Sequence, residues 1–197
     1  MLENLAKYKV ILASNSPRRK ELLAGLDIDF EIKTIPDVDE SYPETLWKEE
    51  IPVYIAKLKA EAYKDYLQED TLLITADTIV WLGGKVYGKP ANEEEAKAML
   101  QTLSGETHEV ITGVCITTRQ KQQAFYAVSK VKFAELEAEE IDYYVKKYKP
   151  YDKAGAYGVQ EWIGYIGVEQ LSGSFYNVMG LPVKMLYTCL KEWNRIS

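Results

Sequence analysis

The chain alternates between strand-like and helix-like segments, and this alternation restricts its fold more than any other feature. Short apolar runs, such as residues 10–13 and 72–82, are followed by stretches whose apolar residues recur three or four positions apart. This pattern predicts an α/β structure in which helices pack on a sheet. The 197 residues can bury about 70% of the surface that the unfolded chain exposes. The length therefore fits one domain or two closely joined lobes.

Capping residues indicate where individual helices begin and end. Ser16 is a suitable N-cap, Pro17 suits the first helical position, and Gly25 can close that helix. Asn92 and Glu95 have the spacing of a capping box. Helices are predicted from residue 17, around 55–66, from 92 to about 103, over 138–148 and over 182–193. Strands are predicted over 10–13, 28–32, 72–82, 110–117, 125–133, 165–171 and 175–179, with a hairpin turn at Gly83–Gly84.

Charge and hydropathy exclude several classes of protein. The formal net charge is -6, whereas proteins with a general nucleic-acid surface are usually basic. No apolar run approaches the roughly 20 residues of a membrane span, and no secretory signal is visible at the N-terminus. Cys115 and Cys189 lack metal-ligand spacing, so both are expected to be free and buried. We therefore expect a cytoplasmic protein with no stable nucleic-acid partner and no membrane partner.

The turn from residue 14 into the first helix carries a charge pattern that stability alone does not favour. Arg18 and Arg19 would lie at the positive end of the helix dipole. A helix N-terminus and arginine side chains both bind anions, phosphate in particular. The alternative is an N-capped surface helix whose arginines are solvated. No P-loop pattern is present, so the chain is not a Walker-type nucleotide-binding protein.

Asp77 interrupts a long apolar strand, where a carboxylate must be paired, metal-bound or neutralised. It is a candidate general base or Mg²⁺ ligand, because hard divalent cations prefer oxygen donors. The alternative is a structural aspartate that accepts hydrogen bonds from backbone N–H groups. The residue type and its position leave these interpretations equally open.

Further charged residues are scattered along the chain, and each alone is typical of a solvated surface. Glu40 and Lys59 have no special context, whereas Lys89 and Lys153 lie beside Gly or Pro in predicted loops, where a fixed backbone can aim the amine. His108 is the only histidine. We expect it to be structural, which disfavours Ser-His-Asp catalysis and histidine-rich zinc sites.

Taken together, these motifs resemble the Maf family of nucleotide pyrophosphatases. The similarity covers nearly the whole chain, so residues 1–197 are predicted to form a single Maf-like domain. It implies an α/β fold with a mixed central sheet and flanking helices, two lobes around a cleft, and an architecture related to inosine-triphosphate pyrophosphatases. The matching stretches are "LASNSPRRKELL", "DVDE", "IAKLKA", "TADTIV", "YGKP", "LSGETHEVITGV", "DKAGAYGVQ" and "VMGLP".

The resemblance also implies an activity and a set of site residues. Members of the family hydrolyse a nucleoside triphosphate to the monophosphate and pyrophosphate with a divalent metal cation, Mg²⁺ or Mn²⁺. Asp77 matches the proton acceptor, and Glu40 and Asp77 are the predicted metal ligands. The predicted substrate-binding residues are Ser14, Arg18, Arg19, Lys59, Thr78, Lys89, Lys153 and Gln160.

Three of these positions differ between branches of the family and predict the base. The branch that resembles 7-methyl-GTP pyrophosphatases typically has Trp, Gln and Glu where this chain has Arg18, Thr78 and Gln160. A primary amide suits thymine or uracil, since it both donates and accepts hydrogen bonds. We therefore expect hydrolysis of dTTP and UTP, with modified pyrimidine nucleotides as further candidates. One departure concerns Glu161, which stands where family members often have glycine.

Other functions stay open from the sequence. A 7-methyl-GTP pyrophosphatase is one alternative, and a nucleotide-binding regulator of cell division without catalysis is another. The set of catalytic residues is intact, which favours an enzyme, and the acidic balance disfavours a nucleic-acid-binding module. The sequence leaves open whether the chain forms a homodimer and which metal it prefers.

Overall fold

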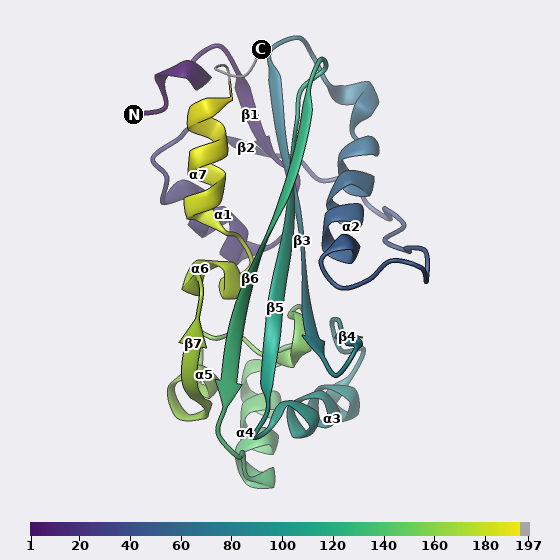
Figure 1. The fold of residues 1–197 in the computed structure, drawn as a ribbon, viewed down its shortest axis with the longest axis vertical. Helices are drawn as coiled ribbons and strands as arrows, with labels where there is room; N and C mark the ends of the chain where they lie inside the picture. The colour runs from purple at the N-terminus through teal and green to yellow at the C-terminus, as the bar shows by residue number, and fades with distance from the viewer. Residues whose placement is uncertain (194–197) are drawn as a thin grey trace. The chain divides into compact units, whose positions relative to one another are not determined.

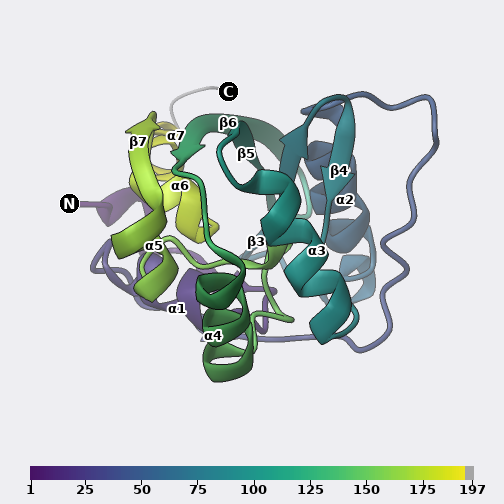
Figure 2. The same cartoon turned by 90° about the horizontal axis from the view of Figure 1, so that it is seen from below.

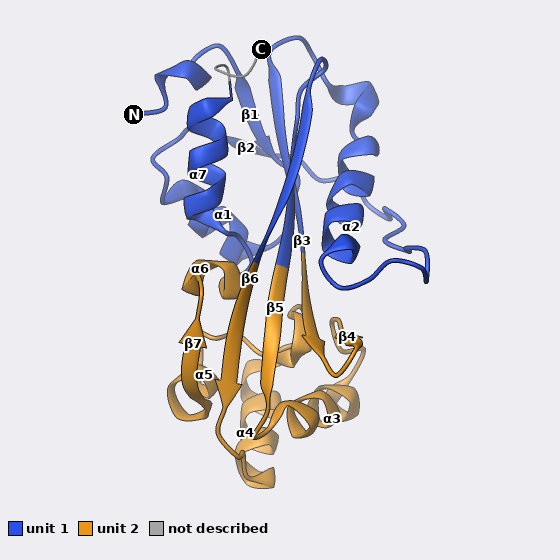
Figure 3. Ribbon diagram, viewed as in Figure 1, with its two compact units in different colours: residues 1–77, 112–127, 180–197 blue, residues 78–111, 128–179 orange. Residues whose placement is uncertain are grey.

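The computed structural model describes residues 1–193 and contains two compact units. Both units are discontinuous in sequence. Three strands contribute residues to each unit: β3 (Thr71–Leu82), β5 (Thr107–Thr117) and β6 (Gln122–Phe133). Figure 3 colours the two units separately. Unit 1 comprises residues 1–77, 112–127 and 180–197, and unit 2 comprises residues 78–111 and 128–179. The single domain expected over 1–197 stays a prediction.

The strands form a mixed sheet in the order β2-β1-β3-β5-β6-β7, with β4 paired to β3 (Figure 1). β1 pairs in parallel with both β2 and β3, whereas the β3–β4 and β6–β7 pairs are antiparallel. The strands are β1 (Lys9–Leu12), β2 (Glu31–Ile32), β3 (Thr71–Leu82), β4 (Lys85–Tyr87), β5 (Thr107–Thr117), β6 (Gln122–Phe133) and β7 (Val168–Ser172).

Each predicted helix is present, although α2 lies earlier in the chain than the predicted 55–66. Helix α4 coincides with the predicted 138–148, and α7 lies within the predicted 182–193. The helices are α1 (Pro17–Ala24), α2 (Glu50–Glu61), α3 (Glu93–Leu103), α4 (Ala138–Tyr148), α5 (Trp162–Gly167), α6 (Phe175–Met179) and α7 (Val183–Glu192). Short 3₁₀ helices cover Glu3–Leu5, Lys64–Tyr66 and Ala154–Ala156.

Unit 1 is a sheet covered by helices on both faces, with α2 on one side of the strands and α1 and α7 on the other (Figure 1). The apolar residues of β1, and those of β3 up to Ala76, are buried as the uninterrupted runs predict, whereas Ile32 on β2 and Tyr126 on β6 are exposed. One core cluster joins β1, α2, β3 and β5, and it consists of Ile11, Ala13, Ala56, Ala60, Tyr63, Leu73 and Cys115. The helix α2 and the strand β3 are therefore fixed against each other by packing.

Two contacts show how closely α2 approaches the strands of unit 1. The buried Thr75 hydroxyl donates a 2.6 Å hydrogen bond to the carbonyl of Ala56. A Cβ added at Gly113 would lie 2.4 Å from backbone atoms of Pro52 and Val53. Backbone therefore packs directly on backbone at Gly113, which leaves no room for a side chain.

Unit 2 begins with the predicted hairpin. Gly83 and Gly84 have φ angles of 58° and 81°, values that a type I′ turn requires at both central positions. Figure 2 shows α3 and α4 of this unit side by side, and the two helices are in contact. The Asn92 side chain caps α3 by accepting from the backbone N–H of Glu95. The Glu95 carboxylate accepts from the N–H of Ala91 rather than from that of Asn92, so the predicted capping box is only half formed.

Three predicted strands differ from the structure. Residues 175–179 form the helix α6 instead of a strand, and the strand predicted over 165–171 begins only at Val168, after α5. The strand predicted over 28–32 is reduced to β2. These segments are short, and a short apolar run does not distinguish a strand from one helical turn. Cys115 and Cys189 are free as expected, although Cys189 is only half-buried.

Candidate functional site

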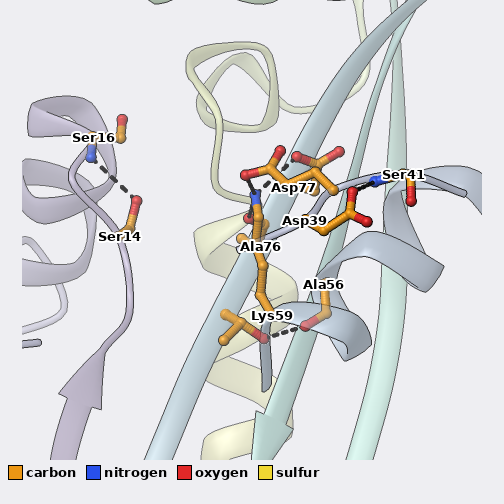
Figure 4. Close-up of polar contacts among 10 residues, drawn as sticks. Ser14, Ser16, Asp39, Ser41, Ala56, Lys59, Ala76 and Asp77 are labelled. Atoms are coloured by element: carbon orange, nitrogen blue, oxygen red, sulfur yellow. Dashed lines mark hydrogen bonds and ion pairs between the residues drawn. The ribbon is translucent and has the colours of Figure 1, made fainter. Parts of the chain in front are cut away.

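Asp77, Lys59 and Glu40 form a charged cluster in unit 1. The Lys59 amine lies 3.1 Å from Asp77 Oδ1 and 3.2 Å from Glu40 Oε1. Figure 4 shows this amine directed at the Asp77 carboxylate and at the backbone carbonyl of Ala76, to which it donates a 3.4 Å hydrogen bond. The side chains of Lys59 and Asp77 are 14% and 13% exposed, whereas that of Glu40 is 46% exposed. The cluster is therefore largely buried at Lys59 and Asp77 and exposed to solvent at Glu40.

The fold positions each member of this cluster by a different means. Asp77 follows the buried residues of β3, and Lys59 projects from α2, so the core between these elements fixes their separation. Glu40 lies on the long segment that precedes α2. The Tyr63 hydroxyl holds the beginning of this segment, because it donates to the carbonyl of Lys33 and accepts from the N–H of Ile35, each at 2.9 Å.

The turn into α1 is built from short polar side chains, as the sequence predicts. The Ser14 hydroxyl accepts a 3.2 Å hydrogen bond from the N–H of Ser16, a contact drawn in Figure 4. Ser16 is the N-cap, and its own hydroxyl accepts from the N–H of Arg19 at 3.4 Å. Ser14 and Arg18 are both half-buried. The turn therefore presents a capped helix N-terminus with two arginines in its first turn.

Arg19 is anchored within unit 1. Its Nε donates a 2.8 Å hydrogen bond to the carbonyl of Gly180. The pKa of Arg19 lies below its ordinary value, and burial is the largest cause. The charge of Arg18 also lowers this pKa, whereas the carboxylates of Asp77 and Glu40 raise it. The carboxylates of Asp77 and Glu40 thus favour the charged form of Arg19, whereas burial opposes it.

Unit 2 carries the other predicted site residues. Thr78 is half-buried on β3, and Lys89 is exposed after β4. Lys153 is buried, and its amine lies 2.9 Å from Asp152 Oδ1 and 3.1 Å from Glu161 Oε1. Lys153 therefore forms ion pairs within its own unit, whereas the Lys89 side chain faces solvent.

Gln160 has hydrogen-bonding capacity that the protein does not use. Its Oε1 atom is buried and accepts no hydrogen bond from any side chain or backbone group in residues 1–193. If the terminal amide is turned over, an N–H group takes this position instead. In either orientation the unpaired polar atom lowers the stability of the fold by about 1 to 3 kcal/mol, unless a ligand supplies the missing hydrogen-bond donor or acceptor. Such a residue is suited to ligand recognition.

Comparison with known proteins identifies the family. The family model described as "Maf-like protein" matches residues 9–193. The chain belongs to the Maf family. A dTTP/UTP pyrophosphatase of Phocaeicola vulgatus is 65% identical over 98% of this chain and 100% of its own length. The protein of the same name from Parabacteroides distasonis is also 65% identical over the same shares, and that from Flavobacterium johnsoniae is 50% identical over 95% and 96%.

The fold of this Maf protein is shared with a solved structure of low sequence identity. A HAM1 protein from Coxiella burnetii superposes with a TM-score of 0.50 at 16% identity, covering 94% of this chain and 99% of the other. The predicted α/β class with a mixed central sheet and flanking helices is thereby confirmed. Among the described helices, none has the length and apolar character that crossing a membrane requires.

The structure brings together two predicted metal ligands, Glu40 and Asp77, without a third His, Cys, Asp or Glu side chain among residues 1–193 to complete a metal-binding group. Glu40 and Asp77 converge on the Lys59 amine, and no group of three or more His, Cys, Asp or Glu side chains in residues 1–193 could hold a metal ion. Mg²⁺ is commonly held by one or two carboxylates together with substrate phosphates and water. The pair therefore fits a metal that substrate oxygens help to bind, and does not fit an all-protein site.

Two residues of unit 2 lie beside Lys153 and Gln160 but outside the set that the sequence predicts. The Tyr144 hydroxyl donates to Glu161 Oε2, and it accepts a 3.0 Å hydrogen bond from the N–H of Gly158. Glu161 was notable in the sequence only as a departure from the family pattern. Tyr144 carries no local signal, because its role depends on contacts with residues 14 and 17 positions further along the chain.

Proposed function

We propose that this protein is a nucleotide pyrophosphatase that hydrolyses dTTP and UTP to the monophosphate and pyrophosphate. The observation that carries the proposal is the 65% identity, over 98% of the chain, to proteins named dTTP/UTP pyrophosphatase. The intact set of charged residues supports an enzyme rather than a regulator that only binds nucleotide.

In this function the turn into α1 binds phosphate oxygens. Ser14 supplies a hydroxyl, and Arg18 and Arg19 supply guanidinium groups that can donate two hydrogen bonds each to a phosphate. The capped helix N-terminus supports this role, since backbone N–H groups there favour an anion. Lys89, exposed after β4, adds a further positive charge for the triphosphate.

Asp77 acts as the proton acceptor. A water oxygen forms a bond to the α-phosphorus, the bond from that phosphorus to the bridging oxygen breaks, and pyrophosphate leaves with the bonding electrons. The proton of the attacking water passes to the Asp77 carboxylate. The ion pair with Lys59 orients this carboxylate and supports the assignment. Catalysis then comes mainly from positioning and from charge, as in other phosphoryl transfers.

Glu40 and Asp77 would hold the divalent metal, with the remaining oxygens supplied by substrate and water. Their convergence on the Lys59 amine supports this assignment, because it brings two carboxylates to one point. When bound, Mg²⁺ or Mn²⁺ would neutralise phosphate charge. Lys59 would keep the two carboxylates together when the metal is absent.

Gln160 recognises the base, together with Thr78. Thymine and uracil present the N3–H donor and the O4 acceptor, and a primary amide can pair with both. The unused hydrogen-bonding capacity of Gln160 supports this role. The same reasoning disfavours 7-methyl-GTP, whose cationic base gains nothing from Arg18.

A panel of nucleoside triphosphates with Mg²⁺ or Mn²⁺, scored for pyrophosphate release, tests the proposal. We expect dTTP and UTP to be the preferred substrates and to yield dTMP and UMP. Formation of a nucleoside diphosphate and orthophosphate would contradict attack at the α-phosphorus. A cytoplasmic location fits these substrates, and a homodimer stays a prediction that sedimentation analysis can check.

A further inference from the structure

Lys153 is the most buried of the charged residues in the predicted site. The Lys153 side chain is 9% exposed and that of Glu161 is 21% exposed, whereas that of Asp152 is 55% exposed. Since solvent screens the Asp152 contact, the pair between Lys153 and Glu161 is the stronger constraint on the chain. A buried ion pair is costly unless further hydrogen bonds satisfy its groups.

Tyr144 supplies such a further hydrogen bond. Glu161 uses Oε1 for Lys153 and Oε2 for the Tyr144 hydroxyl, so both carboxylate oxygens have partners. Tyr144 is fully buried on α4. Burial and the adjacent Glu161 raise the pKa of its hydroxyl, which stays protonated and donates. Glu161 is thus held from α4 on one side and from the 153–158 loop on the other.

The backbone of the same loop packs directly on this pair. A Cβ added at Gly158 would lie 2.9 Å from Lys153 Cε and 3.0 Å from Glu161 Cδ. The N–H of Gly158 donates to the Tyr144 hydroxyl, and its carbonyl accepts from the N–H of Glu161, both at 3.0 Å. The loop from Lys153 to Glu161 therefore closes on itself around one charged pair.

Gln160 lies inside this closed loop, between two fixed neighbours. Glu161 follows it and is the N-cap of α5. Val159 precedes it, and a Cβ added at Gly164 would lie 1.8 Å from the Val159 carbonyl oxygen. The backbone on both sides of Gln160 is consequently held in place, while its side-chain amide keeps unused hydrogen-bonding capacity.

We propose that Glu161 is a positioning residue for base selection, which acts with Lys153 and Tyr144 to fix the backbone that presents Gln160. The proposal rests on the proposed function for the identity of the base. Glu161 itself does not contact the nucleotide. Glu161 determines how accurately the Gln160 amide meets the N3–H and O4 groups of thymine or uracil. In this proposal Lys153 supports the loop.

A merely structural role for this network would lower all activities together, so the test uses the ratio between two bases. dTTP and dCTP share sugar and triphosphate but differ at N3 and at position 4 of the base. We measure kcat/KM for both, and the affinities for dTMP and dCMP by calorimetry, with the wild type and the variants Glu161→Gln, Glu161→Ala and Tyr144→Phe. Matched controls are Glu169→Gln, an exposed carboxylate on β7, and Tyr143→Phe, an exposed tyrosine on α4.

We expect Glu161→Ala and Tyr144→Phe to lower the dTTP to dCTP ratio by about fivefold or more, the lower end of what one mispaired buried group produces. Glu161→Gln should have a smaller effect, because an amide can still accept from Tyr144. The controls should keep the wild-type ratio. If Glu161→Ala does not fold, the dTTP to dCTP ratios of Tyr144→Phe and Glu161→Gln test the proposal.

Equal losses with both nucleotides in all folded variants would overturn the proposal. The monophosphate affinities separate this outcome from a failure of the proposed function. A wild type that releases no pyrophosphate contradicts the proposed function, and its dTMP to dCMP affinity ratio still tests Glu161. A wild type that binds dTMP and dCMP equally contradicts the role of Glu161 even if it hydrolyses dTTP.

Discussion

His108 Nε2 and the hydroxyl oxygen of Tyr157 lie 2.6 Å apart in the interior of unit 2. Both side chains are buried, and the ring of Phe133 lies edge-on to each. Burial lowers the pKa of His108 to about 4 and raises the pKa of Tyr157. The lone histidine is therefore structural, as the sequence predicts, and it stays neutral in the folded protein at physiological pH.

We expect this histidine to make the free energy of unfolding depend on pH. The unfolded chain protonates His108 near the ordinary pKa of about 6.5, whereas the folded protein does so only near 4. The unfolded state thus binds more protons between these values, so stability falls as the pH drops through this window. Urea unfolding of the wild type should lose about 2 kcal/mol more between pH 7 and pH 5 than unfolding of His108→Gln. Equal losses would show that His108 does not titrate in this way.

Asp77→Asn should lower kcat by about 100-fold or more while the protein stays folded. The amide keeps the shape of the carboxylate, but it neither accepts the proton of the attacking water nor pairs with Lys59 by charge. Steady-state pyrophosphate release under saturating metal measures the loss, and circular dichroism confirms folding. Asp65→Asn, at an exposed aspartate in the same unit, is the matched control. Wild-type turnover by Asp77→Asn would rule out its role as proton acceptor.

Gln160→Glu should narrow the preference for dTTP over 7-methyl-GTP. The wild type is expected to favour dTTP and UTP by at least about tenfold in kcat/KM, because a wrong base leaves buried groups unpaired. A carboxylate can only accept hydrogen bonds and attracts a cationic base. Competition assays with both nucleotides measure the ratio. If the wild type hydrolyses 7-methyl-GTP as well as dTTP, the assignment of the base is wrong.

Gly113→Ala should destabilise unit 1 strongly. The added methyl group would lie 2.4 Å from the backbone of Pro52 and Val53, so β5 and α2 must move apart, at a cost of about 1 to 3 kcal/mol or more. Chemical denaturation measures the change. Gly88→Ala is the control, since a Cβ there meets nothing within 4 Å. A Gly113→Ala protein as stable as this control would contradict the close approach.

The sequence predicts those parts of the fold that depend on contacts between neighbouring residues. Capping at Ser16, the glycine pair at 83–84 and the limits of α4 were all readable, because each depends on neighbouring residues. The sequence predicts a strand at α6, because five residues are too few for a helical repeat of apolar positions to be recognised. Asp77 is conspicuous in the sequence because an apolar run surrounds it, and its catalytic role stays a prediction. Its contact with Glu40 through Lys59, by contrast, joins residues far apart in sequence, and the predicted cleft stays a prediction.

The discontinuity of the two units has a consequence for synthesis on the ribosome. Unit 1 needs α7, which is formed by Val183–Glu192, so its core cannot be complete until these residues have been translated. All segments of unit 2 end by residue 179. We therefore expect a fragment that ends at Met179 to protect amides of unit 2 against hydrogen exchange more strongly than those of unit 1. As the chain leaves the ribosome, the half that carries Gln160 would have all its residues before the half that carries Asp77.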